Sequence, residues 1–247
     1  MRTLSFVLLL VVTGFSGTGK KSVYRIGDSA FEGYYADAGK DAPFILIIHD
    51  WDGLTDYEMK RAEMLRKQGY SVFAADLFGK GIRPESIEEK KRLTGALYAD
   101  RAVMRERMLG AIDAARSRGA AVENGVAVGY CFGGTAVLEL ARAGTPFKGF
   151  VSFHGGLVTP DDQDYSKMKG TLLVLHGSAD GVAPPEQLVA LAKKLDKTGI
   201  AHEMVLYGGA DHAFTVFGGE RYDKNADEHS WFRFISFLEE VFGKGDR

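Results

Sequence analysis

The sequence predicts an α/β fold of three layers, with a mainly parallel central sheet and helices on both faces. Unbroken apolar runs such as residues 44–48 are typical of strands that are covered on both sides. Strand-like and helix-like segments alternate along the chain, which favours a parallel sheet. A length of 247 residues, 45% of them hydrophobic, is enough to bury such a core without disulfides or metals.

The strand pattern begins with two short segments around the Gly27-Asp28 turn, residues 22–26 and 31–36, which we expect to form edge strands. The apolar runs that follow predict the strands of the parallel sheet. They are residues 44–48, 72–75, 126–128, 150–153, 172–175 and 204–206. Ligands of such sheets bind at the carboxyl ends of the strands.

Apolar residues at spacings of three and four predict the helices between these strands. They are residues 57–67, 102–116, 135–143, 185–197 and 227–241. Residues 79–100 have the least regular pattern, and we expect a lid or substrate-binding insertion there. The sequence has no internal repeat and no linker that marks a second domain, so residues 17–247 are expected to form a single domain.

Composition excludes several classes of function. With 31 Lys and Arg against 33 Asp and Glu, the formal charge is −2, which predicts neither a nucleic-acid surface nor a polybasic membrane patch. The only tight group of possible metal ligands is His49, Asp50 and Asp52, without a recognised metal-binding spacing, so no metal is expected. The single cysteine, Cys131, is inert packing, a reactive thiol or an intermolecular link.

The first 16 residues resemble an export signal. Arg2 precedes a mainly apolar run over residues 4–12, and Gly14 and Ser16 are small residues spaced for cleavage after Ser16. The run is shorter than the roughly 20 apolar residues that span a bilayer. We therefore predict a periplasmic or secreted protein without stable membrane insertion after cleavage. The alternative is a buried first strand or core helix in a cytoplasmic protein.

Cys131 lies in the most informative segment of the chain. A buried strand over residues 126–128 runs into G-Y-C-F-G-G and then into a helix, which is the nucleophile-elbow pattern with cysteine in place of serine. The glycines leave room for a sharp turn, and the N–H groups that begin the helix stabilise a thiolate and later an oxyanion. This context favours a reactive thiol over inert packing.

An elbow nucleophile needs a base, and the base needs an acid that orients it. In this architecture the chain order is nucleophile, acid, histidine. Asp180 follows the predicted strand 172–175, and His212 follows the strand 204–206. Both therefore lie at the carboxyl edge of the sheet, where Cys131 is also expected. The order and the placement predict a Cys131, Asp180 and His212 triad.

The motifs together resemble the dienelactone hydrolase family of α/β hydrolases. G-Y-C-F-G-G at residues 129–134, H-G-S-A-D at 176–180 and G-A-D-H-A-F at 209–214 carry the resemblance. H-D-W-D-G-L at 49–54 is similar to the H-E-W-x-G-L turn of that family. The resemblance covers about residues 23–241. It implies an α/β-hydrolase fold and a cysteine triad that acts on an ester or lactone.

Other site residues follow from their positions. The backbone N–H groups of Phe132 and Trp51 are the expected oxyanion donors. Asp50 occupies the position where the family has a glutamate thought to contact the resting thiol; its shorter side chain is either a thiol contact or an ordinary loop aspartate. His154 also ends a strand, and it either lines the pocket or makes a structural hydrogen bond.

One position departs from the family. Val216 stands four residues after His212, where dienelactone-cleaving members have an arginine that binds the substrate carboxylate. The cations near residues 79–100 offer substitutes, although a charge run is usually a solvated face. They are Arg83, Lys90, Lys91, Arg92 and Arg101.

The reaction class is therefore predicted more firmly than the substrate. We expect hydrolysis of a small-molecule ester or lactone without a cofactor, by a monomer or weak homo-oligomer. The alternatives are a general carboxylesterase or thioesterase, and a redox-sensing or non-catalytic domain that kept the fold.

Overall fold

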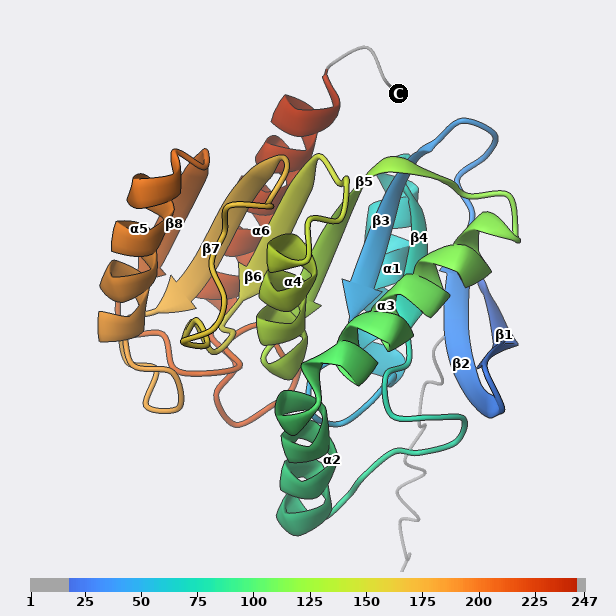
Figure 1. The fold of residues 1–247 in the computed structure, drawn as a ribbon, viewed down its shortest axis with the longest axis horizontal. Helices are drawn as coiled ribbons and strands as arrows, with labels where there is room; N and C mark the ends of the chain where they lie inside the picture. The colour runs from blue at the N-terminus through green and yellow to red at the C-terminus, as the bar shows by residue number, and fades with distance from the viewer. Residues whose placement is uncertain (1–17, 244–247) are drawn as a thin grey trace, which may run out of the picture.

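A computed structural model describes residues 18–243 of the chain. Their strands form one eight-stranded sheet in the order β1-β2-β4-β3-β5-β6-β7-β8 (Figure 1). β1 and β2 are antiparallel to their neighbours, whereas β4, β3 and β5 to β8 run parallel to one another. The predicted export signal, residues 1–16, lies outside the described residues.

The strands contain all the predicted segments. They are β1 (Lys20–Ile26), β2 (Ser29–Ala36), β3 (Pro43–Ile48), β4 (Ser71–Ala75), β5 (Ala121–Tyr130), β6 (Gly149–Phe153), β7 (Thr171–Gly177) and β8 (His202–Tyr207). One expectation was wrong: β2 is not an edge strand, because it pairs with β1 on one side and with β4 on the other.

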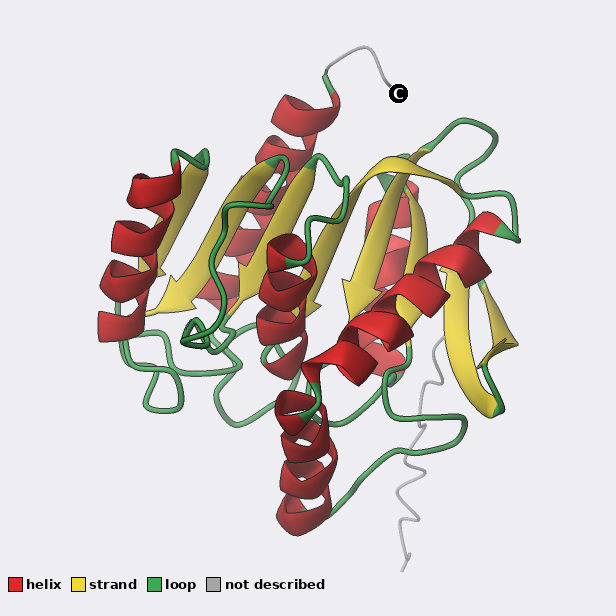
Figure 2. Ribbon diagram, viewed as in Figure 1, coloured by secondary structure: helices red, strands yellow, loops and turns green. Residues whose placement is uncertain are grey.

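The predicted helices are present, and they lie in two layers (Figure 2). The six helices of the described chain are α1 (Asp56–Lys67), α2 (Ile87–Ala99), α3 (Arg101–Arg116), α4 (Phe132–Arg142), α5 (Glu186–Thr198) and α6 (Lys224–Phe242). α3, α4 and α5 cover one face of the sheet, and α1 and α6 cover the other. This arrangement confirms the predicted three-layer fold.

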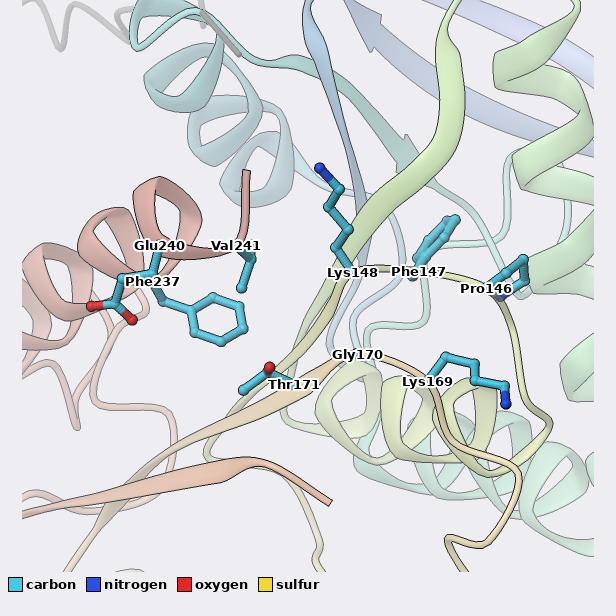
Figure 3. Close-up of a pocket in the computed structure, with 9 residues that line it drawn as sticks. All are labelled: Pro146, Phe147, Lys148, Lys169, Gly170, Thr171, Phe237, Glu240 and Val241. Atoms are coloured by element: carbon cyan, nitrogen blue, oxygen red, sulfur yellow. The ribbon is translucent and has the colours of Figure 1, made fainter. Parts of the chain in front are cut away.

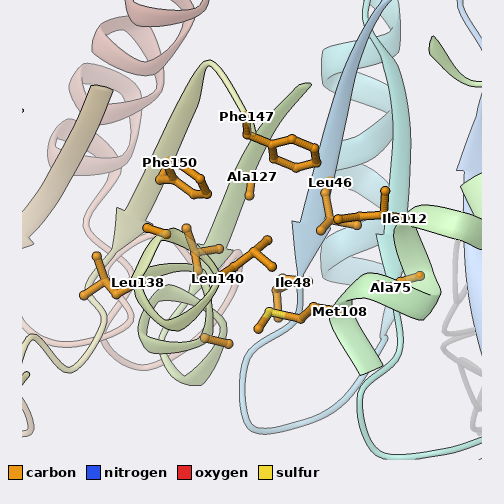
Figure 4. Close-up of a cluster of buried hydrophobic side chains, with 14 of the residues drawn as sticks. Leu46, Ile48, Ala75, Met108, Ile112, Ala127, Leu138, Leu140, Phe147 and Phe150 are labelled. Carbon is orange, nitrogen blue, oxygen red and sulfur yellow. The ribbon is translucent and has the colours of Figure 1, made fainter. Parts of the chain in front are cut away.

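Two apolar cores hold the layers together. Along β3, Leu46 and Ile48 face the core beneath α3 and α4, whereas Ile45 and Ile47 face the core beneath α1 and α6. Figure 4 shows the first core, with Met108 and other side chains of α3 and α4 over the sheet. The period-two alternation of a strand therefore explains why its sequence is apolar throughout.

The region expected to be irregular, residues 79–100, instead contains helix α2. Ser86 caps its first turn by accepting a hydrogen bond from the N–H of Glu89. Few of its side chains are buried, chiefly Thr94 and Leu97, so its apolar pattern is too sparse to read as a helix from sequence. α2 lies beyond the carboxyl ends of the central strands (Figure 1).

Within the described part of the chain, no helix combines the length and the apolar character needed to cross a bilayer.

Candidate active site

Cys131 occupies a strained turn between β5 and α4. Its backbone φ of 52° and ψ of −114° place it in a region that non-glycine residues rarely adopt, at a cost of about 1 to 3 kcal/mol. A Cβ on Gly129 would lie 2.1 Å from the carbonyl oxygen of Gly133, and a Cβ on Gly133 would lie 2.3 Å from that of Ile48. Only glycine fits on either side of the elbow.

The structure brings the three predicted triad residues together. The Nε2 atom of His212 lies 3.0 Å from the Sγ atom of Cys131. The Nδ1 atom of His212 lies 2.9 Å from Oδ2 of Asp180. Asp180 accepts further hydrogen bonds at Oδ1 from the N–H groups of Val182 and Ala183. Its carboxylate is thereby fixed by the loop after β7, and Nδ1–H of His212 donates to it.

The electrostatics of this line keep the acid ionised and the thiol protonated. Burial by itself would raise the pKa of Asp180, but hydrogen bonds from His212 and Ala183 lower it below its ordinary value. The pKa of Cys131 is raised to about 12, first by burial and then by the negative charge of Asp50. The resting site therefore holds a neutral thiol against a histidine that can accept its proton.

Both predicted oxyanion donors lie beside the thiol. The N–H of Phe132 donates toward Cys131, which favours the thiolate against the effect of burial. No side chain caps the start of α4, so its first N–H groups face the site. Trp51, in the loop after β3, lines the same cavity as Cys131. These positions leave both backbone groups next to the atom that an attacking thiolate would approach.

Asp50 acts on Cys131 by charge. It is buried, it lines the cavity with Cys131, and its Oδ1 accepts a hydrogen bond from the N–H of Asp52 at 2.7 Å. Burial and then the neighbouring Glu58 raise the pKa of Asp50 well above its ordinary value. The hydrogen bond of the thiol goes to His212.

His154 is fully buried behind the elbow and is not among the residues that line the cavity. Its Nδ1 lies 3.2 Å from the backbone nitrogen of Cys131, and its Nε2 lies 2.8 Å from Oγ1 of Thr215. Of the two roles considered from sequence, substrate contact is therefore wrong and hydrogen bonding is correct. It contacts the backbone of the cysteine and not its thiol.

A cavity of about 620 Å³ opens over Cys131 and His212. Val216 is part of its wall, which places the position of the absent arginine at the site. The lining residues come from the loops after β3, β5, β7 and β8 and from α2. They are Asp50, Trp51, Asp52, Lys90, Lys91, Cys131, Val182, His212, Ala213, Val216, Gly219, Glu220 and Arg221.

Two residues of the predicted solvated charge run line this cavity, which corrects that interpretation. Lys90 pairs with Asp52 and lies 5.2 Å from the centre of the Trp51 ring. Lys91 follows it on the same helix. Sequence reasoning also missed Arg221, which lies 3.5 Å from Asp211 at the opposite wall. A charge run has the same pattern on a solvated helix and on a helix that closes a pocket, so no sequence signal separated the two.

No group of three or more possible metal ligands occurs among residues 18–243. A second cavity, also of about 620 Å³, lies at the opposite edge of the sheet, where β6 and β7 begin and α6 ends (Figure 3). Lys148, Lys169 and Glu240 are its charged residues. It contains none of the predicted site residues.

The fold and the order of these residues define a class of protein, the α/β hydrolases. The model of the dienelactone hydrolase family matches residues 31–242, and the chain belongs to that family.

Curated relatives agree with this assignment. A protein of Saccharolobus solfataricus named "Putative carboxymethylenebutenolidase" is 27% identical over 237 residues, covering 80% of this chain and 89% of the relative. A protein of Escherichia coli K12 with the same name is 21% identical, covering 95% of this chain and 89% of the relative.

Solved structures show the same fold. A dienelactone hydrolase-like promiscuous phosphotriesterase from metagenomic libraries superposes with a TM-score of 0.84 at 29% identity, covering 91% of this chain and 98% of that structure. A dienelactone hydrolase of Klebsiella pneumoniae superposes with a TM-score of 0.77 at 18% identity, covering 88% and 96% of the two chains. The latter likeness concerns the fold.

Proposed function

We propose that the protein hydrolyses an ester or lactone of a small molecule, with Cys131 as nucleophile, His212 as base and Asp180 as the acid that orients it. The observation that carries this proposal is the line of contacts from Sγ of Cys131 through His212 to Asp180, at the floor of a cavity. Membership of the dienelactone hydrolase family supports the reaction class.

The reaction runs in two steps. Nε2 of His212 takes the S–H proton, and the thiolate attacks the carbonyl carbon of the substrate. The N–H groups of Phe132 and Trp51 stabilise the oxyanion, which collapses when His212 gives its proton to the leaving alkoxide. Water, deprotonated by His212, then attacks the thioester and releases the acid and the thiol. A lactone yields one hydroxy acid, because both products remain joined.

The direct test is hydrolysis of a short-chain p-nitrophenyl ester, with a burst of nitrophenolate equal to the enzyme concentration. Cys131→Ala should lower kcat by at least about 1,000-fold, because the nucleophile is lost and only binding and the oxyanion donors remain. Cys131→Ser is the matched control that keeps a hydroxyl at the elbow. Full activity of the Cys131→Ala variant would exclude the proposed triad.

The same assay separates the alternatives that the sequence left open. A lactone hydrolase has a higher kcat/KM on a lactone than on an acyclic ester, whereas a general carboxylesterase or thioesterase prefers the acyclic substrates. A redox-sensing or non-catalytic domain turns over none of them. In that case reversible oxidation of Cys131 would be the remaining activity.

A second candidate activity is hydrolysis of a phosphotriester. It is supported by the 29% identical solved relative, which is described as a promiscuous phosphotriesterase and matches this chain with a TM-score of 0.84. Attack by the Cys131 thiolate at phosphorus would expel an alkoxide or phenolate, and water would then release the phosphodiester. Release of nitrophenolate from a diethyl nitrophenyl phosphate, lost in Cys131→Ala, tests this activity.

We infer that the protein is exported after cleavage at Ser16. The support is the charged, apolar and small-residue pattern of residues 1–16. Amino-terminal sequencing of the protein from its native cell should begin at Gly17 in the periplasmic or culture fraction. Intact protein that begins at Met1 and remains in the cytoplasm would contradict export.

A further inference from the structure

His154 connects two segments that carry the proposed catalytic groups, and this inference rests on the proposed function. It follows the last residue of β6, and its backbone N–H donates to the carbonyl oxygen of Leu175 in β7. Its side chain is completely buried. The adjacent ends of β5 and β6, paired at Tyr130 and Phe153, place His154 directly beside the elbow.

The hydrogen bonds of His154 define its tautomer. The N–H of Cys131 can only donate, so Nδ1 of His154, at 3.2 Å, accepts and carries no proton. Nε2 therefore carries the proton of the neutral ring and donates it to Oγ1 of Thr215 at 2.8 Å. Burial, and then the nearby His212, lower the pKa of His154 well below its ordinary value, which keeps the ring in this neutral form.

Thr215 lies three residues after His212 in the loop that follows β8, and it is held from behind. Its hydroxyl shares a hydrogen bond of 2.7 Å with the hydroxyl of Tyr57, and its carbonyl oxygen accepts from Arg61 at 2.8 Å. Arg61 is itself buried against Asp227 and lies 4.2 Å from the centre of the Phe217 ring. Thr215 is therefore attached to the rigid packing of α1 against α6.

Backbone strain is concentrated at the segments that His154 joins. Among residues 18–243, four non-glycine residues have a positive φ, and three of them are Cys131, His154 and Ala213. The φ of His154 is 39° and that of Ala213 is 62°. Such conformations persist only where the surrounding structure holds them, and they gather at functional sites. The hydrogen bonds of His154 connect all three strained turns.

We propose that His154 is a positioning residue that fixes the distance between the Cys131 elbow and the loop that carries His212. Its imidazole joins the backbone of the nucleophile to Thr215, without contact with the substrate cavity. The Sγ–Nε2 distance of 3.0 Å is then set before substrate binds. Misplacement of a reacting pair by about 1 Å costs about 100-fold in rate, so such a link has a measurable effect on the chemical step.

The test compares Thr215→Val with Thr215→Ser. Valine has the shape of threonine and lacks the hydroxyl that accepts from His154, whereas serine keeps it. We expect Thr215→Val to lower the kcat for the nitrophenyl ester by about 10- to 100-fold with KM changed less than about twofold, and Thr215→Ser to restore most of the loss. Equal losses in both variants, or a change confined to KM, would overturn the proposal.

A second readout does not depend on ester turnover. Alkylation of Cys131 by iodoacetamide needs the proton transfer to His212, so Thr215→Val should slow it at neutral pH and Thr215→Ser should not. If the unchanged protein hydrolysed no ester, the proposed function would fail while this comparison still tested the positioning role. Unchanged alkylation in Thr215→Val would refute that role.

His154→Asn provides an independent variant if Thr215→Val does not fold. Asparagine tolerates a positive φ, and its side chain is too short to bridge Cys131 and Thr215. We expect the same fall in kcat and in alkylation rate as for Thr215→Val, with the thermal unfolding midpoint measured for each variant. Wild-type rates in a folded His154→Asn protein would also overturn the proposal.

Discussion

At the scale of single residues, Cys131 combines a reactive position with an unreactive resting state. The elbow and the N–H of Phe132 favour a thiolate, whereas burial and the charge of Asp50 raise the thiol pKa to about 12. The second pair of effects is the larger in the resting protein. A neutral thiol reacts slowly with oxidants and alkylating agents, which suits the lone cysteine of a protein predicted to be exported.

Asp50→Asn should make Cys131 more reactive toward iodoacetamide. The substitution removes a negative charge that raises the pKa of the thiol, so that pKa falls toward its ordinary value and the thiolate fraction at a given pH increases. Each unit of that fall increases the fraction about tenfold until the thiol is mostly ionised. The measurement is the alkylation rate as a function of pH.

The pH dependence has a definite sign. Asp50 is ionised only above its own raised pKa, so the variant and the wild type should differ most at alkaline pH and converge on acidification. Asp52→Asn is the matched control, since Asp52 is a smaller cause of the thiol shift than Asp50. Identical pH profiles for Asp50→Asn and wild type would exclude an electrostatic role for Asp50.

At the scale of elements, α2 decides what surrounds the candidate site. The helix lies beyond the carboxyl ends of the strands and contributes Lys90 and Lys91 to the cavity (Figure 1). Lys90 is already paired with Asp52. Lys91 is therefore the cation of α2 with which a substrate carboxylate can pair in place of the arginine absent at Val216.

Lys91→Ala should raise the KM for an ester that carries a carboxylate by about fivefold, and it should leave the KM for a neutral nitrophenyl ester unchanged. An exposed ion pair is worth at most about 1 kcal/mol, which corresponds to this factor. The measurement is steady-state kinetics on the two substrates. Lys194→Ala, at an exposed position of α5 outside the cavity, is the control. An equal effect on both substrates would contradict a carboxylate contact.

A buried ion pair joins two other elements, α1 and α6. Arg61 is 1% exposed, pairs with Asp227, and lies over the rings of Phe217 and Trp231. Removal of one partner leaves a buried charge without compensation, which costs about 3 to 5 kcal/mol. Because Arg61 also holds the carbonyl of Thr215, this pair supports the loop that carries His212.

Arg61→Leu should lower the free energy of unfolding by about 3 to 5 kcal/mol, measured by urea denaturation. The double variant Arg61→Leu with Asp227→Leu should lose less than Arg61→Leu alone, because no unpaired charge remains. A loss below about 1 kcal/mol in the single variant would show that the pair is weakly coupled to stability.

At the scale of the whole molecule, the site results from parallel pairing. Cys131 follows β5, His154 follows β6, Asp180 follows β7 and His212 follows β8, and these four strands are consecutive neighbours in the sheet. Parallel strands end at the same edge, so residues far apart in the sequence meet there. The strand pattern and the chain order were therefore sufficient to predict which residues gather.

The sequence determined by itself the layered fold, the elbow and the grouping of Cys131, Asp180 and His212, because apolar periodicity and glycine spacing are local signals. Only the tertiary structure decided that α2 is a helix whose lysines line the cavity, that Arg221 faces them, and that His154 lies behind the elbow. The physical reason is that a charge run or a histidine has the same local pattern in solvent, in a pocket wall and in a buried hydrogen bond. Which of these environments it occupies depends on residues distant in the chain, such as Thr215 for His154.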